Sequence, residues 1–344
     1  MRKKIIIIGN MHPSSIENMF YNSFKKLEVD IKILDPNKHL NKLIHNKFFI
    51  KIFKNIYFYY YNRVILKYLN FNNNEKNTND IVFFFKGESL NKSFLFKIKN
   101  TLKNYTIINF NTDNPFYNNS NLNKKIKGCI KYFDYYFTWS KEIRNKIIKN
   151  KFQKKNKVIY LPFAFDSKNK KKFNLNTLQV KDKILFYGSW DKDREKMINQ
   201  LNNDKIEIYG NAWQKASSEF KKRYKIFFKD IFGIILAKKI REYGACLNIN
   251  RPQVGNSHNM RLFEVTGYGG LLISPQTKET NFFFKNNKEI ITYKDQSSLK
   301  DILKINFKNR NLINIRKNSL KVSKNHSYVI RSIRILTVLK NDKI

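Results

Sequence analysis

The chain has 344 residues, which is enough for two α/β domains that each bury a core of their own. Hydrophobic residues make up 42% and aromatic residues 15%, so the composition excludes a disordered protein. The formal net charge of +42 would ordinarily indicate a nucleic-acid partner. Lys, Asn, Ile and Phe are abundant in every segment, however, and no aromatic RNP pattern or helix-turn-helix accompanies a basic block. We therefore favour a general compositional bias and expect no specific nucleic-acid partner.

Cysteines, histidines and the N-terminus exclude several further classes. Cys129 and Cys246 lie far apart, and the five histidines show no ligand spacing, so we expect neither a disulfide framework nor a metal site. The start MRKKIIIIGN is too short for a signal peptide, and no run of about 18 uncharged apolar residues occurs. The expectation is a cytoplasmic protein, with peripheral contact at the inner face of an anionic membrane as an option.

In the first half, apolar runs alternate with helical periodicity. A helix is expected through Ile16, Phe20, Phe24 and Leu27, and a polar loop over 72–79. Strands are predicted over 3–9, 29–34, 81–85, 105–110, 135–139 and 158–163. This alternation is typical of a parallel, Rossmann-like sheet, which we assign to residues 1–166 as the acceptor domain. The Lys- and Asn-rich stretch 166–182 has no periodicity and predicts the domain boundary.

The segment from Phe48 to Phe71 is dense in aromatic residues and carries interspersed Lys and Arg. The plainer interpretation is a half-buried helix whose long basic side chains reach solvent past apolar surface. The sharper one is a basic aromatic face that rests on a membrane or holds a lipid-linked acceptor. We favour the plainer interpretation at this point.

The second half repeats the α/β pattern. ILFYGSW opens it as a strand, a helix follows over 194–201, KIEIYG is the next strand, and a long helical region runs to Glu242. A strand EIITY, a helix capped by Asp295 or Ser297 and a last helix over 328–339 complete it. We predict a nucleotide-binding Rossmann-like domain over 180–325. Residues 326–344 are expected to form a helix that crosses back to the first domain, over a central cleft between the two.

The stretch from Ala245 to Ser274 predicts a strand, a loop, a short helix, a glycine turn and a second strand. Ser257 is the expected N-cap of the helix, and the glycines at 267, 269 and 270 end it. A loop between a parallel strand and a helix N-terminus favours anions, because unpaired N–H groups point into it. The loop from Asn250 to Arg261, which includes Arg251, is therefore the first choice of site.

Several of these motifs resemble one family. ILFYGSWDKDRE, IYGNAW, LNINRP, NSHNMRLFEVTGYGGLLIS and HSY look like the C-terminal half of the CgeB-type glycosyltransferases of the group 1 superfamily. KG at Lys86–Gly87, NTDNPF over 111–116 and YLPFAFD over 160–166 resemble the N-terminal half. The resemblance covers nearly the whole chain in order. It implies a GT-B fold, with a nucleotide-sugar donor held by the second domain, an acceptor held by the first, and no obligatory metal or other cofactor.

The loop chemistry agrees with a diphosphate ligand. Arg261 can bind a pyrophosphate bidentately, and Asn259 with the N–H groups near Ser257 and His258 can supply neutral donors. Glu264 lies one turn further on, where a carboxylate can accept both ribose hydroxyls, and the resemblance gives it that same role. The alternative is that Arg261 and Glu264, spaced i and i+3, form only a helix ion pair.

A second donor-binding candidate is the turn after the first strand of the second domain. Gly188 lets the backbone approach a phosphate, Ser189 and Trp190 follow it, and Arg194 adds charge. An ordinary solvated turn is nearly as good an interpretation. Beyond the next strand, Gly210 and Trp213 can floor a base by stacking, although a lone Trp more often belongs to a core.

On the acceptor side, Asp113 is the carboxylate best placed to deprotonate a hydroxyl in an inverting transfer, and His12 is a weaker candidate. Asp113 is equally well explained as a turn residue before Pro115. Many retaining GT-B enzymes carry a second glutamate eight positions before the ribose glutamate, and here that position is Asn256. The stereochemical course therefore does not follow from the resemblance.

These observations predict a metal-independent hexosyltransferase. The expected donor is a nucleotide diphosphate sugar, UDP-linked for preference, and the acceptor a hydroxyl on a glycan, a lipid-linked saccharide or a protein. The alternatives are a non-catalytic nucleotide- or glycan-binding protein of the same fold, and a basic binder of nucleic acid or membrane surfaces.

Overall fold

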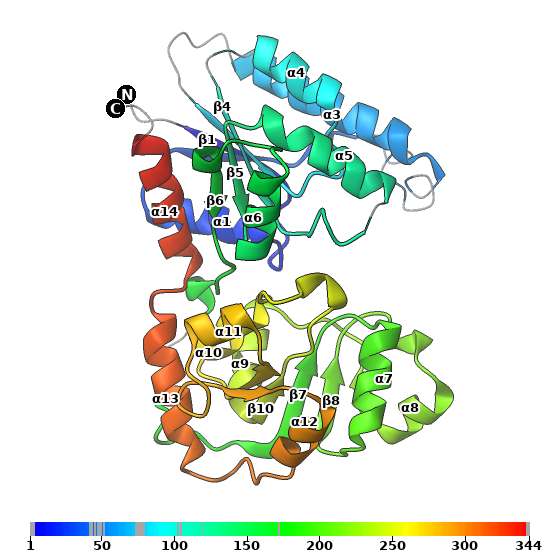
Figure 1. The fold of residues 1–344 in the computed structure, drawn as a ribbon, viewed down its shortest axis with the longest axis vertical. Coiled ribbons are helices and arrows are strands. Elements are labelled where there is room, and N and C mark those ends of the chain that lie inside the picture. The colour runs from blue at the N-terminus through cyan, green and yellow to red at the C-terminus, as the bar shows by residue number, and fades with distance from the viewer. Residues whose placement is uncertain are drawn as a thin grey trace. The chain divides into compact units, whose positions relative to one another are not determined.

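The computed structural model describes residues 4–40, 44, 46, 50, 52–72, 80–101, 103, 105–118, 120–170 and 173–341. Contacts divide the chain into two compact units, Met1–Pro162 and Phe163–Ile344 (Figure 1). Each unit is built on a parallel six-stranded sheet covered by helices. Residues 73–79, expected to be a polar loop, lie outside the described ranges.

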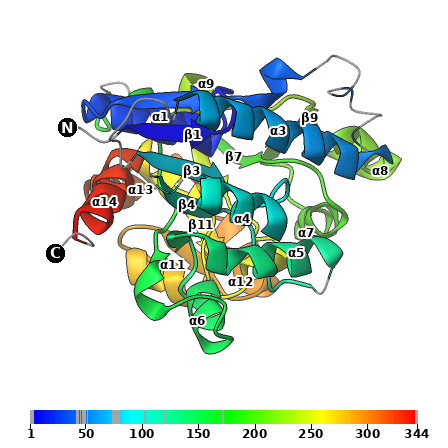
Figure 2. The same cartoon turned by 90° about the horizontal axis from the view of Figure 1, so that it is seen from above.

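Unit 1 has the strand order β2-β1-β3-β4-β5-β6. The strands are β1 (Ile5–Ile8), β2 (Ile31–Leu34), β3 (Ile81–Phe85), β4 (Thr106–Asn111), β5 (Tyr135–Thr138) and β6 (Val158–Tyr160). The helices are α1 (Ile16–Lys26), α3 (Lys54–Asn72), α4 (Lys92–Thr101), α5 (Asn121–Cys129) and α6 (Lys141–Lys149). Strand β1 is buried along its whole length, because a parallel strand covered on both faces has no solvent side. Figure 2 shows α3, α4 and α5 next to one another.

Unit 2 has the strand order β12-β11-β10-β7-β8-β9. The strands are β7 (Lys181–Tyr187), β8 (Ile206–Tyr209), β9 (Lys225–Phe227), β10 (Tyr243–Leu247), β11 (Leu272–Pro275) and β12 (Ile291–Tyr293). Numbered within the unit, this is the doubly wound order 3-2-1-4-5-6 of the Rossmann fold. The order reverses between β7 and β10, which pair in parallel. Sheets of this kind bind ligands where the carboxyl ends of two such strands diverge.

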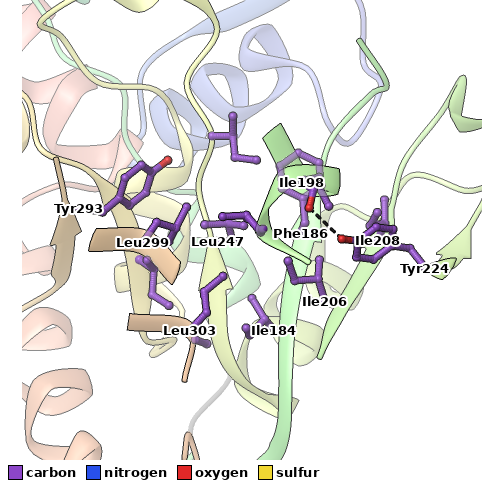
Figure 3. Close-up of a cluster of buried hydrophobic side chains, with 14 of the residues drawn as sticks. Ile184, Phe186, Ile198, Ile206, Ile208, Tyr224, Leu247, Tyr293, Leu299 and Leu303 are labelled. Atoms are coloured by element: carbon purple, nitrogen blue, oxygen red, sulfur yellow. Dashed lines mark hydrogen bonds between the residues drawn. The ribbon is translucent and has the colours of Figure 1, made fainter. Parts of the chain in front are cut away.

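Helices cover both faces of the unit 2 sheet, and the described part of the unit contains eight α-helices in all. They are α7 (Lys192–Leu201), α8 (Ser218–Arg223), α9 (Gly233–Glu242), α10 (Arg261–Gly267), α11 (Lys278–Phe283), α12 (Gln296–Leu303), α13 (Leu312–Ser323) and α14 (Tyr328–Asn341). One face packs against α7, α8 and α12 through a buried cluster that includes Phe186, Ile198 and Leu299 (Figure 3). The Tyr224 hydroxyl, at the edge of this cluster, donates to the Ile198 carbonyl over 2.8 Å. This core fixes the position of β7, whose end carries the candidate site.

Three local predictions were wrong. The region expected to be one long helix up to Glu242 contains α8, the edge strand β9 and α9, because Ile226 and Phe227 pair with β8. The short helix begins at Arg261, with Met260 and not Ser257 at its N-cap. The side chain of Asn259 accepts from the Arg261 N–H over 3.0 Å and turns the chain into the helix there. The apolar-rich run Cys246–Asn250, which predicts the strand before the loop, is only partly in a strand, because β10 covers Tyr243–Leu247.

The two ends of unit 2 are bonded to each other. Phe165 donates its N–H to the His326 carbonyl over 3.1 Å, and Tyr328 donates to the Phe165 carbonyl over 3.0 Å. The Arg331 guanidinium adds a 3.0 Å hydrogen bond to the Phe163 carbonyl. Helix α14 thus continues from a segment that is paired with the first residues of the unit.

Candidate functional site

Tyr187, the last residue of β7, forms hydrogen bonds with both Arg261 and Glu264, one through its backbone carbonyl and the other through its hydroxyl. Its carbonyl accepts from Arg261 Nε over 2.8 Å and from Arg261 Nη2. Its hydroxyl donates to Glu264 Oε2 over 3.0 Å and is buried. Arg261 and Glu264 are therefore each bonded to Tyr187, and the ion pair between them that we considered as the alternative is not formed.

Gly188 lets the Arg261 guanidinium lie directly against the backbone. A Cβ at this position would stand 2.2 Å from Arg261 Nη2 and 3.4 Å from Arg194 Nη1. The φ angle of Gly188 is +147°, which residues with a side chain rarely adopt. Two guanidinium groups thus flank one glycine at the carboxyl end of β7, and no other residue fits between them.

A third guanidinium joins this group through Asp191, the N-cap of α7. Asp191 Oδ2 lies 3.1 Å from Arg251 Nε and 3.4 Å from Arg194 Nε. Burial of Arg194, with further repulsion from Arg261 and Arg251, lowers its pKa to about 9. Arg194 and Arg251 therefore share the Asp191 carboxylate, with Arg261 close to Arg194, and the site carries an excess of positive charge that a polyanion would neutralise.

The β7–α7 turn adds donors without charge. The Trp190 N–H donates to the Asn211 carbonyl over 2.9 Å, and Arg194 Nη1 donates to the Ser189 carbonyl over 2.8 Å. Among the described residues, neither the N–H nor the hydroxyl of Ser189 has a hydrogen-bond partner. Ser189 therefore presents two donors beside Arg194, as a phosphate site requires.

Glu264 is a buried carboxylate. It is 9% exposed, and burial raises its pKa, opposed by the nearby charge of Arg261 and by the Tyr187 hydroxyl. Among the described residues, the Tyr187 hydroxyl is the single hydrogen-bond partner of the Glu264 carboxylate group. Oε1 is therefore left to accept from a ligand hydroxyl.

Asn259 supports the loop from inside. Its Nδ2 donates to Asn248 Oδ1 over 2.7 Å and to Asn250 Oδ1 over 2.8 Å, while its Oδ1 accepts from the Arg261 N–H. Asn248 in turn donates to Ser274 Oγ over 3.0 Å. The side-chain groups of Asn259 and the side-chain oxygen Oδ1 of Asn250 thus belong to one amide network, which fixes where the helix begins at Arg261.

His258 and Ser257 lie below the loop surface. The Phe163 N–H donates to His258 Nε2 over 3.2 Å, so Nδ1 carries the proton and donates to Glu279 Oε2 over 2.5 Å. Burial lowers the pKa of His258. Ser257 is 1% exposed, and its carbonyl accepts from the Thr277 hydroxyl over 2.8 Å. The side chain of His258 therefore anchors the loop and is not available to a ligand. That the backbone N–H groups near Ser257 and His258 donate to an anion stays a prediction.

Gly210 and Trp213 hold the Gly188 turn from the side of β8. A Cβ on Gly210 would stand 2.1 Å from the Gly188 carbonyl oxygen, and Trp213 Nε1 donates to that oxygen over 2.8 Å. Trp213 is 0% exposed and stacks on Phe220. Of the two predicted roles for Trp213, a stacking surface for a base or a core residue, the second is therefore the one observed, because a nucleotide base has no access to the buried ring. Trp190 is half-buried and donates to Glu195 Oε2 over 2.6 Å.

In unit 1, both acceptor-side candidates follow strands that end at the same edge of the sheet. Asp113 comes two residues after β4, and its N–H donates to Asn111 Oδ1 over 3.0 Å in an Asx turn. His12 follows β1, is exposed, and its Nδ1 lies 2.7 Å from Ser14 Oγ. Their roles stay predictions.

Sequence reasoning missed three residues that organise the site: Tyr187, Asp191 and Asn248. Asp191 carried a detectable signal, because an Asp three residues after a strand-ending glycine is a typical N-cap. Within the described ranges, no group of His, Cys, Asp and Glu could hold a metal ion, and no helix has the length and apolar character to cross a bilayer.

Comparison with known proteins gives one family match. Residues 193–337 match a family model described as glycosyl transferase-like, and these residues include α7, the Asn250–Arg261 loop and Glu264. No curated protein sequence matches the chain. The finer resemblance to CgeB-type enzymes stays a prediction.

Solved structures match over the whole length of the chain. HepE of Anabaena, in a complex with UDP and glucose, has a TM-score of 0.65 at 8% identity, covering 99% of this chain and 100% of its own. A trehalose-6-phosphate synthase from Burkholderia multivorans has a TM-score of 0.62 at 8% identity, covering 100% and 99%. A glycosyltransferase from Rickettsia africae has a TM-score of 0.59 at 12% identity, covering 99% of each chain. These likenesses confirm the predicted fold class, two Rossmann-like α/β domains as in GT-B glycosyltransferases.

Proposed function

We propose that this protein is a glycosyltransferase that moves a hexose from a nucleoside diphosphate sugar, UDP-linked for preference, to an acceptor hydroxyl. The carrying observation is the group of three arginines at the end of β7, in which Arg194 and Arg251 share the Asp191 carboxylate and Arg261 lies against Gly188. The glycosyl transferase-like family match over 193–337 supports the same class. The UDP in the HepE complex supports the choice of nucleotide.

The arginines supply what the chemistry of this transfer demands. When the bond from the sugar C1 to the diphosphate oxygen breaks, the leaving group gains negative charge that the protein must stabilise. Arg261, fixed by Tyr187 and Gly188, is already oriented before a ligand arrives, so little reorganisation is needed. Ser189 adds two uncharged donors. In this proposal the guanidinium groups provide the countercharge, without a metal or other cofactor.

Glu264 has the chemistry of a ribose-binding group. Its Oε2 is held by the Tyr187 hydroxyl, and Oε1 is left to accept from the ligand. A carboxylate in a buried position makes hydrogen bonds to hydroxyl groups stronger than a neutral acceptor does. In this proposal the nucleoside and the diphosphate bind to adjacent parts of α10, because Glu264 lies one turn from Arg261.

In an inverting transfer, the acceptor oxygen attacks C1 as the bond from C1 to the diphosphate oxygen breaks, and the acceptor proton passes to a base. We assign that base to Asp113, with His12 as the second candidate, because both follow strand ends of unit 1. The acceptor is a hydroxyl on a glycan, a lipid-linked saccharide or a protein.

The test is calorimetric titration of the purified chain with UDP, GDP, TDP and CMP, followed by their sugars. The variants are Glu264→Ala and Arg261→Ala, and Arg223→Ala on α8 is the matched control because its nearest acidic partner is the exposed Asp204. We expect one nucleotide to bind and both site variants to lose about 30-fold or more in affinity, since each removes a charged hydrogen-bonding group. The control should bind as the wild type does.

Two results would count against the proposal. Binding that survives both site substitutions would show that the nucleotide lies elsewhere. Tight binding of a nucleotide sugar with neither transfer nor hydrolysis of the sugar, across a panel of glycan and lipid-linked acceptors, would favour the non-catalytic binding protein.

A further inference from the structure

Three neighbouring helices of unit 1, α3, α4 and α5, carry cations and no carboxylate. Their nine basic residues are Lys54, Arg63, Lys67, Lys92, Lys97, Lys99, Lys124, Lys125 and Lys127. Helix α7 of unit 2, by contrast, alternates Lys and Arg with Asp193 and Glu195. Acidic partners come from outside the three helices, where Glu88 pairs with Lys54 and Asp134 with Lys99. Figures 1 and 2 both show the three helices next to one another.

Large apolar side chains stand exposed on the same helices. Tyr59 is 61% exposed and Ile56 46% exposed on α3, and Phe96 is 58% exposed on α4. Ile56 and Tyr59 are three residues apart, so they share one side of α3. Exposed apolar groups set among cations are the composition of a surface that inserts into the interface of an anionic membrane.

A groove of about 570 Å³ lies between these helices. Arg63 of α3, Lys97 of α4 and Lys125 of α5 line it, together with the rings of Phe58 and Tyr59, and no carboxylate does. Lys125 Nζ lies 4.9 Å from the centre of the Phe58 ring, and burial lowers its pKa. A phosphate in the groove would meet three cations from three different helices.

Asn62 supplies a second, independent indication of a ligand. It lines the groove and is 5% exposed. Its Nδ2 donates to the Ser89 carbonyl over 2.8 Å, while its buried Oδ1 has no hydrogen-bond partner among the described residues. Buried polar atoms are nearly always paired, so a lining residue with an unpaired amide oxygen is consistent with a ligand that donates a hydrogen bond in the groove. A hydroxyl group carried next to a phosphate would satisfy this oxygen.

We propose that the α3–α4–α5 face docks on an anionic phospholipid bilayer, and that its groove takes the phosphate and hydroxyl of a lipid headgroup. The apolar side chains enter the interfacial layer, while the cations lie at the level of the headgroups. This inference is independent of the proposed sugar transfer, because none of these residues belongs to the candidate donor site.

The experiment is cosedimentation of the full chain with vesicles of phosphatidylcholine, with and without phosphatidylglycerol, at physiological ionic strength. One variant, Arg63→Glu with Lys97→Glu, reverses the groove charge, and another, Ile56→Ser with Tyr59→Ser, removes apolar surface. The control, Lys221→Glu with Lys222→Glu on α8, makes the same change in net charge on an exposed helix of unit 2. Circular dichroism and melting temperature verify that each variant is folded.

We expect binding that requires phosphatidylglycerol, with a loss of about tenfold or more in the groove-charge variant and less than about twofold in the control. The apolar variant should also lose affinity, and Glu264→Ala should sediment as the wild type does. The proposal is overturned if the control loses as much as the groove variant, which would mark a diffuse effect of net charge. It is equally overturned if the apolar variant binds normally, or if excess free glycerol phosphate releases the protein from the vesicles, which would make the groove a site for a soluble ligand.

Discussion

The substitution Gly188→Ala tests the arrangement at the end of β7 with a single methyl group. The new Cβ would stand 2.2 Å from Arg261 Nη2, so the guanidinium must leave the Tyr187 carbonyl. The lost charged hydrogen bonding is worth about 2 kcal/mol. The positive φ of +147° adds about 1–2 kcal/mol of backbone strain. The expected loss of stability of unit 2 is therefore about 3–4 kcal/mol, which lowers its melting temperature by about 6–16 °C.

Thermal and urea unfolding measure this loss, and nucleotide titration of the folded variant measures its effect on the site. Gly87→Ala is the matched control, because a Cβ there would meet nothing closer than Ile126 Cγ1 at 3.5 Å. A double-mutant cycle with Arg261→Ala isolates the contact between the new methyl group and the guanidinium. In the Arg261→Ala background, Gly188→Ala should cost only the strain of about 1–2 kcal/mol, so the coupling energy between the two positions should be about 2 kcal/mol. An equal cost in both backgrounds would refute the placement of the guanidinium against Gly188.

Three further substitutions test other parts of unit 2. Burial raises the folded-state pKa of Glu264, so the stability that depends on its proton is present below pH 4.5 and is lost as pH rises through the raised pKa. Glu264→Gln should flatten this decline of the unfolding free energy, measured by urea unfolding between pH 4 and 8. An unchanged pH profile would contradict the assigned burial of the carboxyl group. Trp213→Phe keeps the stacking on Phe220 but removes the Nε1 donor to the Gly188 carbonyl, and should cost about 1–2 kcal/mol in thermal unfolding and weaken nucleotide binding. The buried Arg316 guanidinium donates to the carbonyls of Tyr243, Gly244 and Gly269, and Arg316→Lys removes part of this hydrogen bonding. The free energy of unfolding should therefore fall by about 2–4 kcal/mol, while the folded fraction binds nucleotide with unchanged affinity.

Much of the fold was predictable because its strands carry a strong local signal. The isoleucines of β1 are all buried and the apolar run of β3 is buried except at its last residue, Phe85, as expected of parallel strands covered on both faces. The capping of α12 by Asp295 was also one of the two predicted options. Strand β9 escaped prediction because a three-residue edge strand is specified by its neighbour β8 more than by its own residues.

The candidate site was predictable as a set of residue types but not as a structure. Arg261 and Glu264 were identified from the loop sequence, yet their common partner Tyr187 lies 74 and 77 positions earlier. Spacing along one helix suggested an ion pair, and only the folding of β7 beside α10 shows that each residue bonds to Tyr187. The same limit applies to Trp213, whose burial depends on Phe220 and Phe186 packing around it.

The bonding between the two ends of unit 2 has a consequence for synthesis of the protein on the ribosome. Unit 1 is one continuous segment, so all of its strands are available before unit 2 is translated. Unit 2 cannot pair Phe165 with its partners until residues 326–328 have left the exit tunnel. A premature stop codon just before Ser327 would remove a small fraction of the chain, yet it would leave the Phe165 carbonyl without the Tyr328 donor. We expect such truncated chains to be degraded by quality-control proteases, although most of the β7–β12 sheet would be intact.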